Sequence, residues 1–318
     1  MKHKKIIINL LVILAAFVLF IWWYERQKNA ELFATLPTSL QNNFKIYLIT
    51  KEKNVEFWEV MNQGAADMSD LLGMQYIWDA PETLDTDEQI RILNNAVNSG
   101  ADAILLAAND ADRLAEPVRV AKEKGVKIVY VDSPAKEEAI TILATNNYEA
   151  GRIAGENILD ELEFAGIQSG EIGIVSVSLT NQTTLQREQG FQDVIKTDGR
   201  FTLLDTVYTL GNPIESQKAT ENIIKQNPKL VGLFGTNQGS SEGVGSAIKE
   251  DNNRIIGIGF DQSKLNLELL NDNSFKAIIN QNPYTMGYLG TAQAFAALMG
   301  YDTGPPYMNT GVSVLMKR

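Results

Sequence analysis

The sequence Ala144-Thr145-Asn146-Asn147-Tyr148-Glu149-Ala150-Gly151-Arg152-Ile153-Ala154-Gly155 lies close to the midpoint of the part of the chain that is expected to fold. The apolar residues at 139–143 predict a strand that runs into this sequence, and a helix is predicted to begin after the two asparagines. The small residues of that helix allow close packing on a sheet. Taken alone, the stretch is also explained as an ordinary connection in which asparagine caps a helix. Because one strand and helix series precedes it and a second follows, we expect the chain to change lobes here.

The composition limits the chemistry that the folded part can perform. The 318 residues are 44% hydrophobic and 21% charged, which suits a globular chain with two cores. There is no cysteine, so disulfides, thiolate catalysis, thiolate metal sites and a lipid-modified cysteine are excluded. The single histidine, His3, lies in a basic tail, so the folded part has no imidazole base and no histidine metal ligand. We therefore expect no metal and no cofactor.

The N-terminus predicts a membrane anchor. Residues 1–5 form a basic tail. Residues 6–24 are apolar except for Asn9 and the tip of Tyr24, over a length of about 28 Å, close to the thickness of the hydrocarbon core. The run ends in Trp22-Trp23-Tyr24, as suits the outer interface, with the basic tail on the cytoplasmic side. The alternative is a cleaved signal peptide, which normally has a shorter apolar core and a small-x-small cleavage site. In either case we expect export, with 25–43 as a stalk if the anchor is retained. The net charge of −11 argues against nucleic acid as a partner.

Strands and helices are predicted to alternate twice along the chain, once on each side of the midpoint sequence. Strands are predicted at 45–50, 74–78, 103–107, 127–132, 139–143, 171–177, 201–209, 230–235, 254–260 and 275–280. Helices are predicted at 57–72, 87–98, around Pro117, from about 148, and at 185–196, 214–226, 241–249, 264–270 and 285–298. Such alternation favours right-handed crossovers and parallel sheets that are covered on both faces. The predicted fold class is α/β, repeated twice.

Ligands of such folds bind outside the carboxyl ends of the strands. The residues predicted there are two aromatics and a set of planar hydrogen-bonding side chains: Phe57, Trp58, Asp132, Asn146, Asn147, Arg187, Asn237, Asp261 and Gln281. Such groups grip neighbouring hydroxyls of a sugar, and an aromatic ring covers its apolar face. No pair of carboxylates comes with a recognisable nucleophile or base, which favours binding over glycoside hydrolysis. Each residue alone is also explained as a cap or turn, so only their joint occurrence indicates a sugar site.

The segment 235–245 is a competing motif, because it is rich in glycine and lies between a strand and a helix, as a phosphate-binding loop does. It lacks the Gly-Lys-Ser/Thr ending and the spacing of a dinucleotide-binding loop. A nucleotide site is therefore the weaker interpretation.

Several motifs occur in a specific order between residues 45 and 317. They are Phe57-Trp58 followed by Gly64-Ala65, Gly100-Ala101-Asp102-Ala103-Ile104, Val131-Asp132, Thr145-Asn146-Asn147 with Gly151 and Gly155, Arg187-Glu188-Gln189-Gly190-Phe191, Thr236-Asn237, Gly259-Phe260-Asp261 and Gln281-Asn282-Pro283. In this order they resemble the type I periplasmic sugar-binding proteins, the ribose- and galactose-binding group that shares its core with LacI-type repressors.

The resemblance implies two Rossmann-like lobes joined by a hinge that the chain crosses three times, near Asn146, Gln281 and Asn309. The N-terminal lobe would comprise 44–145 and 282–308, and the C-terminal lobe 146–281 and 309–318. The resemblance also implies that the paired aromatics sandwich a sugar ring and that the polar residues bind its hydroxyls. The implied ligand-binding residues are Phe57, Trp58, Asp132, Asn146, Arg187, Asn237, Asp261 and Gln281.

The sequence departs from the ribose binders at two places. Ser133 stands where they have an arginine, and Ala107 stands at about the position where they have an asparagine, so ribose is not the expected ligand. A repressor is not expected, since the membrane segment occupies the place of the DNA-binding helices.

The predicted anchor resembles that of xylose-responsive co-receptors, which signal through a sensor histidine kinase of a two-component system. We expect a single-pass membrane protein whose extracytoplasmic lobes bind a pentose or hexose and which is not an enzyme. The expected partner is a sensor histidine kinase, and the alternative is the permease of a sugar ABC importer. An exported enzyme acting on a sugar or nucleotide, and a purely structural surface domain, remain the alternatives from other classes.

Overall fold

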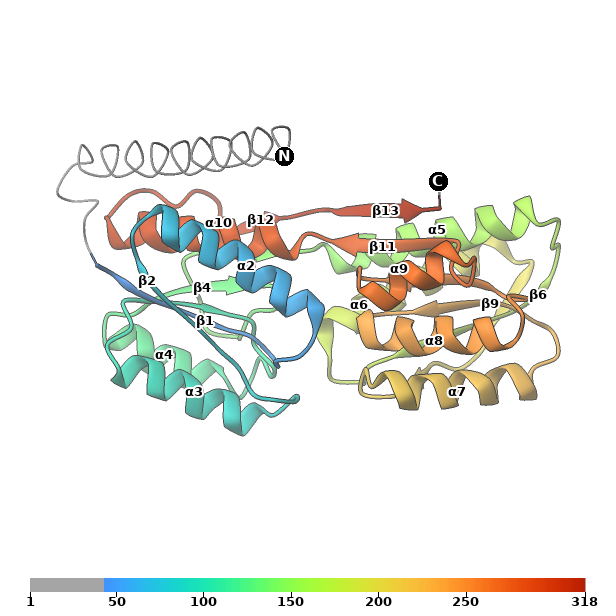
Figure 1. Ribbon diagram of the computed structural model, residues 1–318, viewed down its shortest axis with the longest axis horizontal. Coiled ribbons are helices and arrows are strands. Elements are labelled where there is room, and N and C mark those ends of the chain that lie inside the picture. The colour runs from blue at the N-terminus through green and yellow to red at the C-terminus, as the bar shows by residue number, and fades with distance from the viewer. Residues whose placement is uncertain (1–42, 318) are drawn as a thin grey trace, which may run out of the picture. The chain divides into compact units, whose positions relative to one another are not determined.

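The computed structural model describes residues 43–317 (Figure 1). The predicted tail at 1–5, the anchor at 6–24, and all but the last residue of the stalk at 25–43 lie outside the described residues. Among residues 43–317, no helix is both long and apolar enough to cross a membrane. The described chain forms two sheets of mainly parallel strands with helices packed on them, which confirms the predicted α/β class.

Six parallel strands form the first sheet, in the order β12-β5-β4-β3-β1-β2. Their bounds are β1 Lys45–Ile49, β2 Gln75–Asp79, β3 Ala103–Leu106, β4 Lys127–Val131, β5 Ile142–Ala144 and β12 Tyr307–Asn309. The helices of this lobe are α2 Glu56–Leu71, α3 Thr86–Asn98, α4 Ala115–Glu123 and α10 Pro283–Leu298. The late elements α10 and β12, red in Figure 1, therefore join a lobe that is otherwise built from the first half of the chain.

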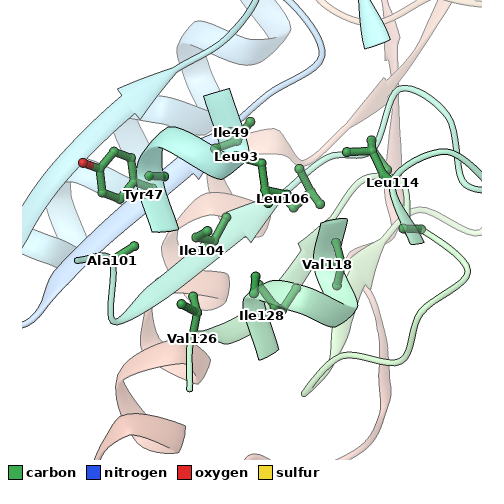
Figure 2. Packing of buried hydrophobic residues seen from close by; sticks show 14 of the residues in the cluster. Tyr47, Ile49, Leu93, Ala101, Ile104, Leu106, Leu114, Val118, Val126 and Ile128 are labelled. Atoms are coloured by element: carbon green, nitrogen blue, oxygen red, sulfur yellow. The ribbon is translucent and has the colours of Figure 1, made fainter. Parts of the chain in front are cut away.

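One face of this sheet packs against α3 and α4 (Figure 2). Ile104 and Leu106, two residues apart on β3, are fully buried in a cluster with Leu93 of α3 and Val118 of α4. The period of two is the one expected of a strand with a different helix layer on each face. Alternation along the strands thus builds the core of the lobe.

The helix α2 is held on the other face by an unusually close contact with α10. A Cβ atom at Gly64 would lie 2.2 Å from the carbonyl oxygen of Tyr284, and one at Gly287 would lie 2.1 Å from that of Met61. Only glycine permits this approach at both positions. The contact lies at Met61 and Gly64 of α2, one to two turns after Phe57, the first aromatic of the predicted site.

The second sheet has seven strands, in the order β13-β11-β10-β9-β6-β7, with β8 also paired to β6. Only β13 is antiparallel to its neighbour. The strands are β6 Gly170–Ser176, β7 Phe201–Leu203, β8 Val207–Tyr208, β9 Leu230–Gly235, β10 Ile256–Phe260, β11 Ala277–Gln281 and β13 Val312–Met316. The helices are α5 Asn147–Phe164, α6 Gln182–Asp198, α7 Pro213–Gln226, α8 Gln238–Glu250 and α9 Lys264–Asn271. One apolar cluster joins α5 and α6 to the sheet, and another joins α7, α8 and α9 to it.

The small residues of α5 serve two different neighbours. Ala150 and Ala154 are buried against the sheet, as the sequence predicts. Gly151 instead faces α6, where a Cβ atom would lie 1.9 Å from the carbonyl oxygen of Arg187. Gly190 of α6 makes the reciprocal contact, because a Cβ there would lie 2.0 Å from the carbonyl oxygen of Tyr148. The glycine in the midpoint sequence therefore brings two helices together rather than a helix and a sheet.

The strand predicted at 201–209 is two short strands, β7 and β8. Both pair with β6, at its beginning and at its end respectively, and residues 204–206 interrupt them. Within this interruption the Thr206 hydroxyl donates to the buried Glu188 carboxylate over 2.6 Å, a bond that diverts the chain from the ladder. The interruption leaves β8 and the residues after it close to the end of β6.

The chain passes between the two sheets three times, after β5, after β11 and after β12. Hydrogen bonds tie the three crossing segments together. The backbone N–H of Asn146 donates to Asn309 Oδ1 over 3.2 Å, and Asn282 Nδ2 donates to the carbonyl oxygen of Thr310 over 2.6 Å. The crossings thus form one connected hinge region.

Candidate functional site

A cavity of about 550 Å³ is lined by residues of both lobes at the carboxyl ends of the strands. Of the residues predicted at the strand ends, all but Asn146 and Asn147 line it: Phe57, Trp58, Asp132, Arg187, Asn237, Asp261 and Gln281. The carboxyl ends of the strands therefore bring together residues that are up to about 220 positions apart in the sequence, as expected for parallel sheets.

Arg187 is the most extensively fixed of these residues. It lies on α6, is 3% exposed, and donates from Nε to Asn147 Oδ1 over 2.8 Å and from Nη1 to the carbonyl oxygen of Thr236 over 3.0 Å. Its guanidinium lies 3.9 Å from the ring centroid of Phe260. Burial lowers the pKa of the guanidinium, while the carboxylates of Asp261 and Asp132 raise it. An arginine does not deprotonate in proteins, so it is a permanent charged donor on the cavity wall.

Two aspartates end strands in the same manner, one in each lobe. Asp132 follows β4 and Asp261 follows β10, and both have a left-handed backbone, with φ of 64° and 66°. The N–H of Asp132 donates to Leu143 and that of Asp261 to Ile279, each over 2.9 Å to a carbonyl oxygen of the adjacent strand. Residues held in this region of backbone space concentrate at functional sites.

The carboxylate of Asp261 is held by Gln281, whose Nε2 donates to Oδ1 over 2.9 Å. Burial raises the pKa of Asp261 to about 6, and the nearby Arg187 opposes this rise. Both residues are almost fully buried, and Gln281 Oε1 has no hydrogen-bond partner among the described residues. A buried acceptor without a partner is uncommon in proteins, and this oxygen is itself covered from solvent.

Lys51 is a site residue that the sequence analysis missed. It is 7% exposed and lines the cavity, with Nζ 3.1 Å from Asp132 Oδ2 and 5.9 Å from the ring centroid of Trp58. The residues from 51 to 56 read as a charged, solvated loop, and a lysine there is ordinarily exposed. Lys51 lies two residues after β1, and its burial depends on its ion pair with the distant Asp132, so its position in the sequence does not identify it.

The aromatic pair is arranged differently from what the resemblance implies. The rings of Phe57 and Trp58 are both buried and in edge-to-face contact, with centroids 4.8 Å apart and planes at 86°. Carbon atoms in contact lie about 3.5–4.0 Å apart, so two rings that enclose a third need about 7–8 Å between them. The pair cannot sandwich a sugar in this arrangement and forms a single wall of the cavity.

Of the two asparagines at the midpoint, Asn146 was the implied ligand-binding residue, but Asn147 is the one that contacts the site through Arg187. Asn146 does not line the cavity, and its Oδ1 caps α5 by accepting from the N–H of Glu149 over 3.1 Å. Asn147 is 5% exposed and holds Arg187. Asn237 both caps α8, through the N–H of Ser240 at 3.0 Å, and lines the cavity. The cap explanation, left open for each single residue, thus holds in full for Asn146 and in part for Asn237.

Close packing accounts for the glycines of the segment 235–245. A Cβ atom would lie 2.6 Å from Ser241 Cα at Gly235, 2.4 Å from Ser216 Cβ at Gly243, and 2.6 Å from a Leu269 methyl at Gly245. Nothing in this pattern calls for a phosphate. Within residues 43–317, no group of three or more histidine, cysteine, aspartate or glutamate side chains could hold a metal ion.

Hydrogen bonds also cross directly between the lobes beside the cavity. The N–H of Phe57 donates to Gln238 Oε1 over 3.2 Å, and the N–H of Lys264 donates to the Glu56 carboxylate over 3.0 and 3.2 Å. Both bonds join the start of α2 to the starts of helices in the second lobe, α8 and α9. These hydrogen bonds therefore depend on the position of one lobe relative to the other.

Residues 46–302 match the family described as periplasmic binding protein domain. The chain belongs to this family. The type I periplasmic sugar-binding family predicted from the sequence is therefore confirmed.

The family relatives include proteins with named ligands. The chain is 25% identical to the ribose import binding protein RbsB of Bacillus subtilis, over 82% of this chain and 83% of the relative. It is 24% identical to the xylose/arabinose-binding protein XylF of Sulfolobus acidocaldarius, over 83% of this chain and 71% of the relative. A carbohydrate transporter solute binding protein from Agrobacterium radiobacter, solved in complex with D-arabinose, is 28% identical, with a TM-score of 0.82 over 86% of this chain and 95% of the other.

Proposed function

We propose that this protein binds an uncharged monosaccharide, a pentose or hexose, between its two lobes and releases it unchanged. The observation that carries the proposal is the set of buried hydrogen-bonding side chains from both lobes around one cavity, with Asp132 from the first lobe and Arg187, Asp261 and Gln281 from the second. A sugar hydroxyl donates and accepts at once, so it suits a wall that offers a guanidinium and carboxylates together.

The charges of the cavity favour an uncharged ligand. Lys51 is paired with Asp132, and Arg187 interacts with the charges of Asp261 and Asp132, so each cation has a compensating carboxylate. A ligand with its own carboxylate or phosphate would leave a buried aspartate without compensation, which is costly. Phe57 and Trp58 supply an apolar wall for the C–H face of a sugar ring.

The relatives support a pentose or a closely related hexose. Their names include ribose and xylose/arabinose binding, and solved relatives contain D-arabinose and D-fucose. The side chain of Ser133, which stands at the position of the missing arginine, is bound to the protein itself, because its hydroxyl donates to the carbonyl oxygen of Ala108 over 3.1 Å. Ribose therefore remains the least expected of these sugars.

The test is a thermal-shift screen of D-ribose, D-xylose, D- and L-arabinose, D-fucose, D-galactose and D-glucose, followed by calorimetry. A sugar at 100 times its dissociation constant should add about 2.7 kcal/mol to the free energy of unfolding. Overnight incubation and mass spectrometry should return the sugar unchanged, since a receptor does no chemistry. The absence of stabilisation by every sugar in the screen would overturn the proposal, and a chemically altered sugar would move the protein to the enzyme class.

We further propose that the receptor works at the membrane, tethered by the predicted anchor at 6–24, and reports bound sugar to a sensor histidine kinase. The anchor supports this role, because a spanning helix can pack beside the helices of a partner whereas a loose tether cannot. The second candidate is the binding subunit of a sugar ABC importer, which the names of the import binding relatives support.

A further inference from the structure

The cavity is larger than a monosaccharide. A hexose has twelve non-hydrogen atoms, so it fills at most about 360 Å³ even if each atom takes the volume of a liquid water molecule, about 30 Å³. The cavity measures about 550 Å³. Two hydrogen bonds, from Phe57 to Gln238 and from Lys264 to Glu56, already join the lobes, so this volume belongs to lobes that touch each other.

The additional space is lined by two exposed leucines among mostly polar side chains, which include Asn54, Thr83, Asn181, Asn212 and Glu215. Leu84 of the first lobe and Leu210 of the second both line the cavity and are 44% and 71% exposed, whereas Arg187, Asp261 and Gln281 are almost fully buried. The cavity thus has an inner polar part and an outer part with an aliphatic side chain from each lobe. A ligand that covers such side chains gains from their removal from water.

Leu210 has a backbone that leucine rarely adopts. Its φ is 53°, in the left-handed region, where a leucine has no polar side-chain atom to compensate the strain. The conformation is fixed by its N–H, which donates to the carbonyl oxygen of Val177 over 2.9 Å, and by the 2.6 Å hydrogen bond between the Thr209 and Ser216 hydroxyls. An exposed leucine recovers little of this cost by packing in the core, and such strain concentrates at ligand sites.

Gly211 connects the outer part of the cavity to the inner part. It lines the cavity next to Leu210, and a Cβ atom at this position would lie 2.9 Å from Nδ2 of Asn237. A side chain here would fill the space between the leucine and the inner asparagine. Glycine keeps the two parts continuous.

We propose that the outer part of the cavity is a second subsite, which takes the apolar aglycone of a glycoside while the sugar ring occupies the inner part. The proposal rests on the proposed function, because it requires a sugar in the inner part. Leucine side chains offer dispersion and apolar burial but no hydrogen bonds, so they suit a hydrocarbon group better than a second sugar ring.

The test is calorimetry with two series of probes. One comprises D-xylose, methyl β-D-xylopyranoside, phenyl β-D-xylopyranoside and xylobiose, and the other comprises D-galactose with its methyl and phenyl β-D-glycosides and lactose. In at least one series, the phenyl glycoside should bind about 10-fold more tightly than the methyl glycoside, with a more negative heat-capacity change.

Variants test whether the preference for the phenyl glycoside depends on Leu210 and Leu84. Leu210→Asn should fold well, since asparagine tolerates the left-handed backbone, and should lower the ratio of phenyl to methyl glycoside affinity towards one. Leu84→Asn should lower the same ratio. Leu179→Asn is the matched control, because Leu179 is also 71% exposed but does not line the cavity, and it should leave the ratio unchanged.

Three results would overturn the second subsite while leaving the proposed function intact. They are a sugar that binds while its phenyl glycoside binds no more tightly than the methyl glycoside, a gain from xylobiose or lactose without a gain from the phenyl group, and an equal loss of the ratio in Leu179→Asn and Leu210→Asn. Failure of every sugar in the broader thermal-shift screen would instead overturn the proposed function, and this inference with it.

Discussion

Arg187 carries the largest share of the polar contacts that the candidate site can make. Two of its nitrogens are bound to Asn147 and Thr236, and Nη2 makes no hydrogen bond to any residue between 43 and 317. The fixed nitrogens orient the guanidinium, and the free nitrogen is available to a sugar hydroxyl. A charge-assisted hydrogen bond contributes about 1.5–3 kcal/mol.

We therefore expect Arg187→Ala to weaken sugar binding at least about 10-fold, measured by calorimetry with the sugar that the screen identifies. Arg187→Lys should lose most of the same affinity, because an ammonium group cannot reproduce the planar fork. Arg152→Ala, on the exposed face of α5, is the control and should bind as the parent does. Parent-like affinity in Arg187→Ala would remove this residue from the site.

The pKa of Asp261 predicts a pH dependence of stability. Burial raises it from the ordinary value of 3.8 to about 6 in the folded protein. The folded protein then holds this proton more tightly than the unfolded chain, so the stabilising contribution is complete below about pH 4 and is lost as the pH rises through about 6. Between these values, we expect the Asp261 contribution to the free energy of unfolding to fall with increasing pH.

The measurement is urea unfolding of the sugar-free protein and of Asp261→Asn at a series of pH values from 4 to 7.5. Taking the difference between the two free energies of unfolding cancels the contributions of the other carboxylates. This difference should shift in favour of Asp261→Asn as the pH rises, because the amide cannot ionise. A difference that is independent of pH would show that Asp261 has an ordinary pKa.

Site residues could be predicted from the sequence where the position at the end of a parallel strand was sufficient. They could not be predicted where the role of a residue depends on a contact with a residue distant in sequence. Asp132 and Asp261 could be predicted because parallel strands deliver their carboxyl ends to one edge. Lys51 could not be distinguished from a solvated lysine, because its burial depends on Asp132, which is distant in sequence. The choice between Asn146 and Asn147 depends on which of them meets Arg187, and a helix cap can use either.

At the scale of elements, the contact between α5 and α6 determines where Arg187 lies. Gly151 faces the carbonyl oxygen of Arg187 itself, at 1.9 Å from a hypothetical Cβ atom. Any side chain here must push α6 away and displace the arginine from the cavity wall. The midpoint sequence therefore influences the site through packing, although its own Asn146 does not line the cavity.

We expect Gly151→Ala to lower the free energy of unfolding by about 1–3 kcal/mol, since the overlap outweighs the gain of up to about 1 kcal/mol in helix propensity. Sugar affinity should fall with it. Asp160→Ala, at an exposed position of the same helix, is the control and should change neither quantity appreciably. Urea midpoints and calorimetry check both, and an unchanged midpoint in Gly151→Ala would show that the helices can separate at little cost.

The elements themselves followed from hydrophobic periodicity, because a doubly covered parallel sheet produces long apolar runs between amphipathic helices. One exception was 201–209, where two short strands are separated at 204–206, the segment in which Thr206 bonds to the distant Glu188. The short strands β12 and β13 near the C-terminus were also not among the predicted strands. The edge-to-face arrangement of Phe57 and Trp58 was also beyond the sequence. Adjacent positions on a helix fix only the directions of the side chains, and the packing of α2 against α10 decides how the rings meet.

At the scale of the whole molecule, three tied crossings and the direct bonds between α2 and the second lobe couple the position of the lobes to the cavity between them. A ligand that contacts both lobes favours the conformations in which they are close, to the extent that it binds those conformations more tightly. The surface beside the bond from Lys264 to Glu56 includes Val60 of α2 and Leu265 of α9, which are 43% and 39% exposed. One residue of each lobe thus offers an apolar side chain to a partner next to a contact that changes when the lobes move.

This arrangement leads to a prediction about the membrane partner. A photo-crosslinking residue placed at Val60 or Leu265 in the full chain, in native membranes, should give an adduct to a sensor histidine kinase whose yield changes on addition of the sugar. The reason is that, under the proposed function, lobe movement would alter this surface while an anchor at 6–24 would keep the receptor beside its partner. The same residue at Phe164, which is 91% exposed at the end of α5, is the control and should give no sugar-dependent adduct. A sugar-dependent adduct to an ABC permease, with none to a kinase, would assign the protein to import instead, as the names of its relatives suggest.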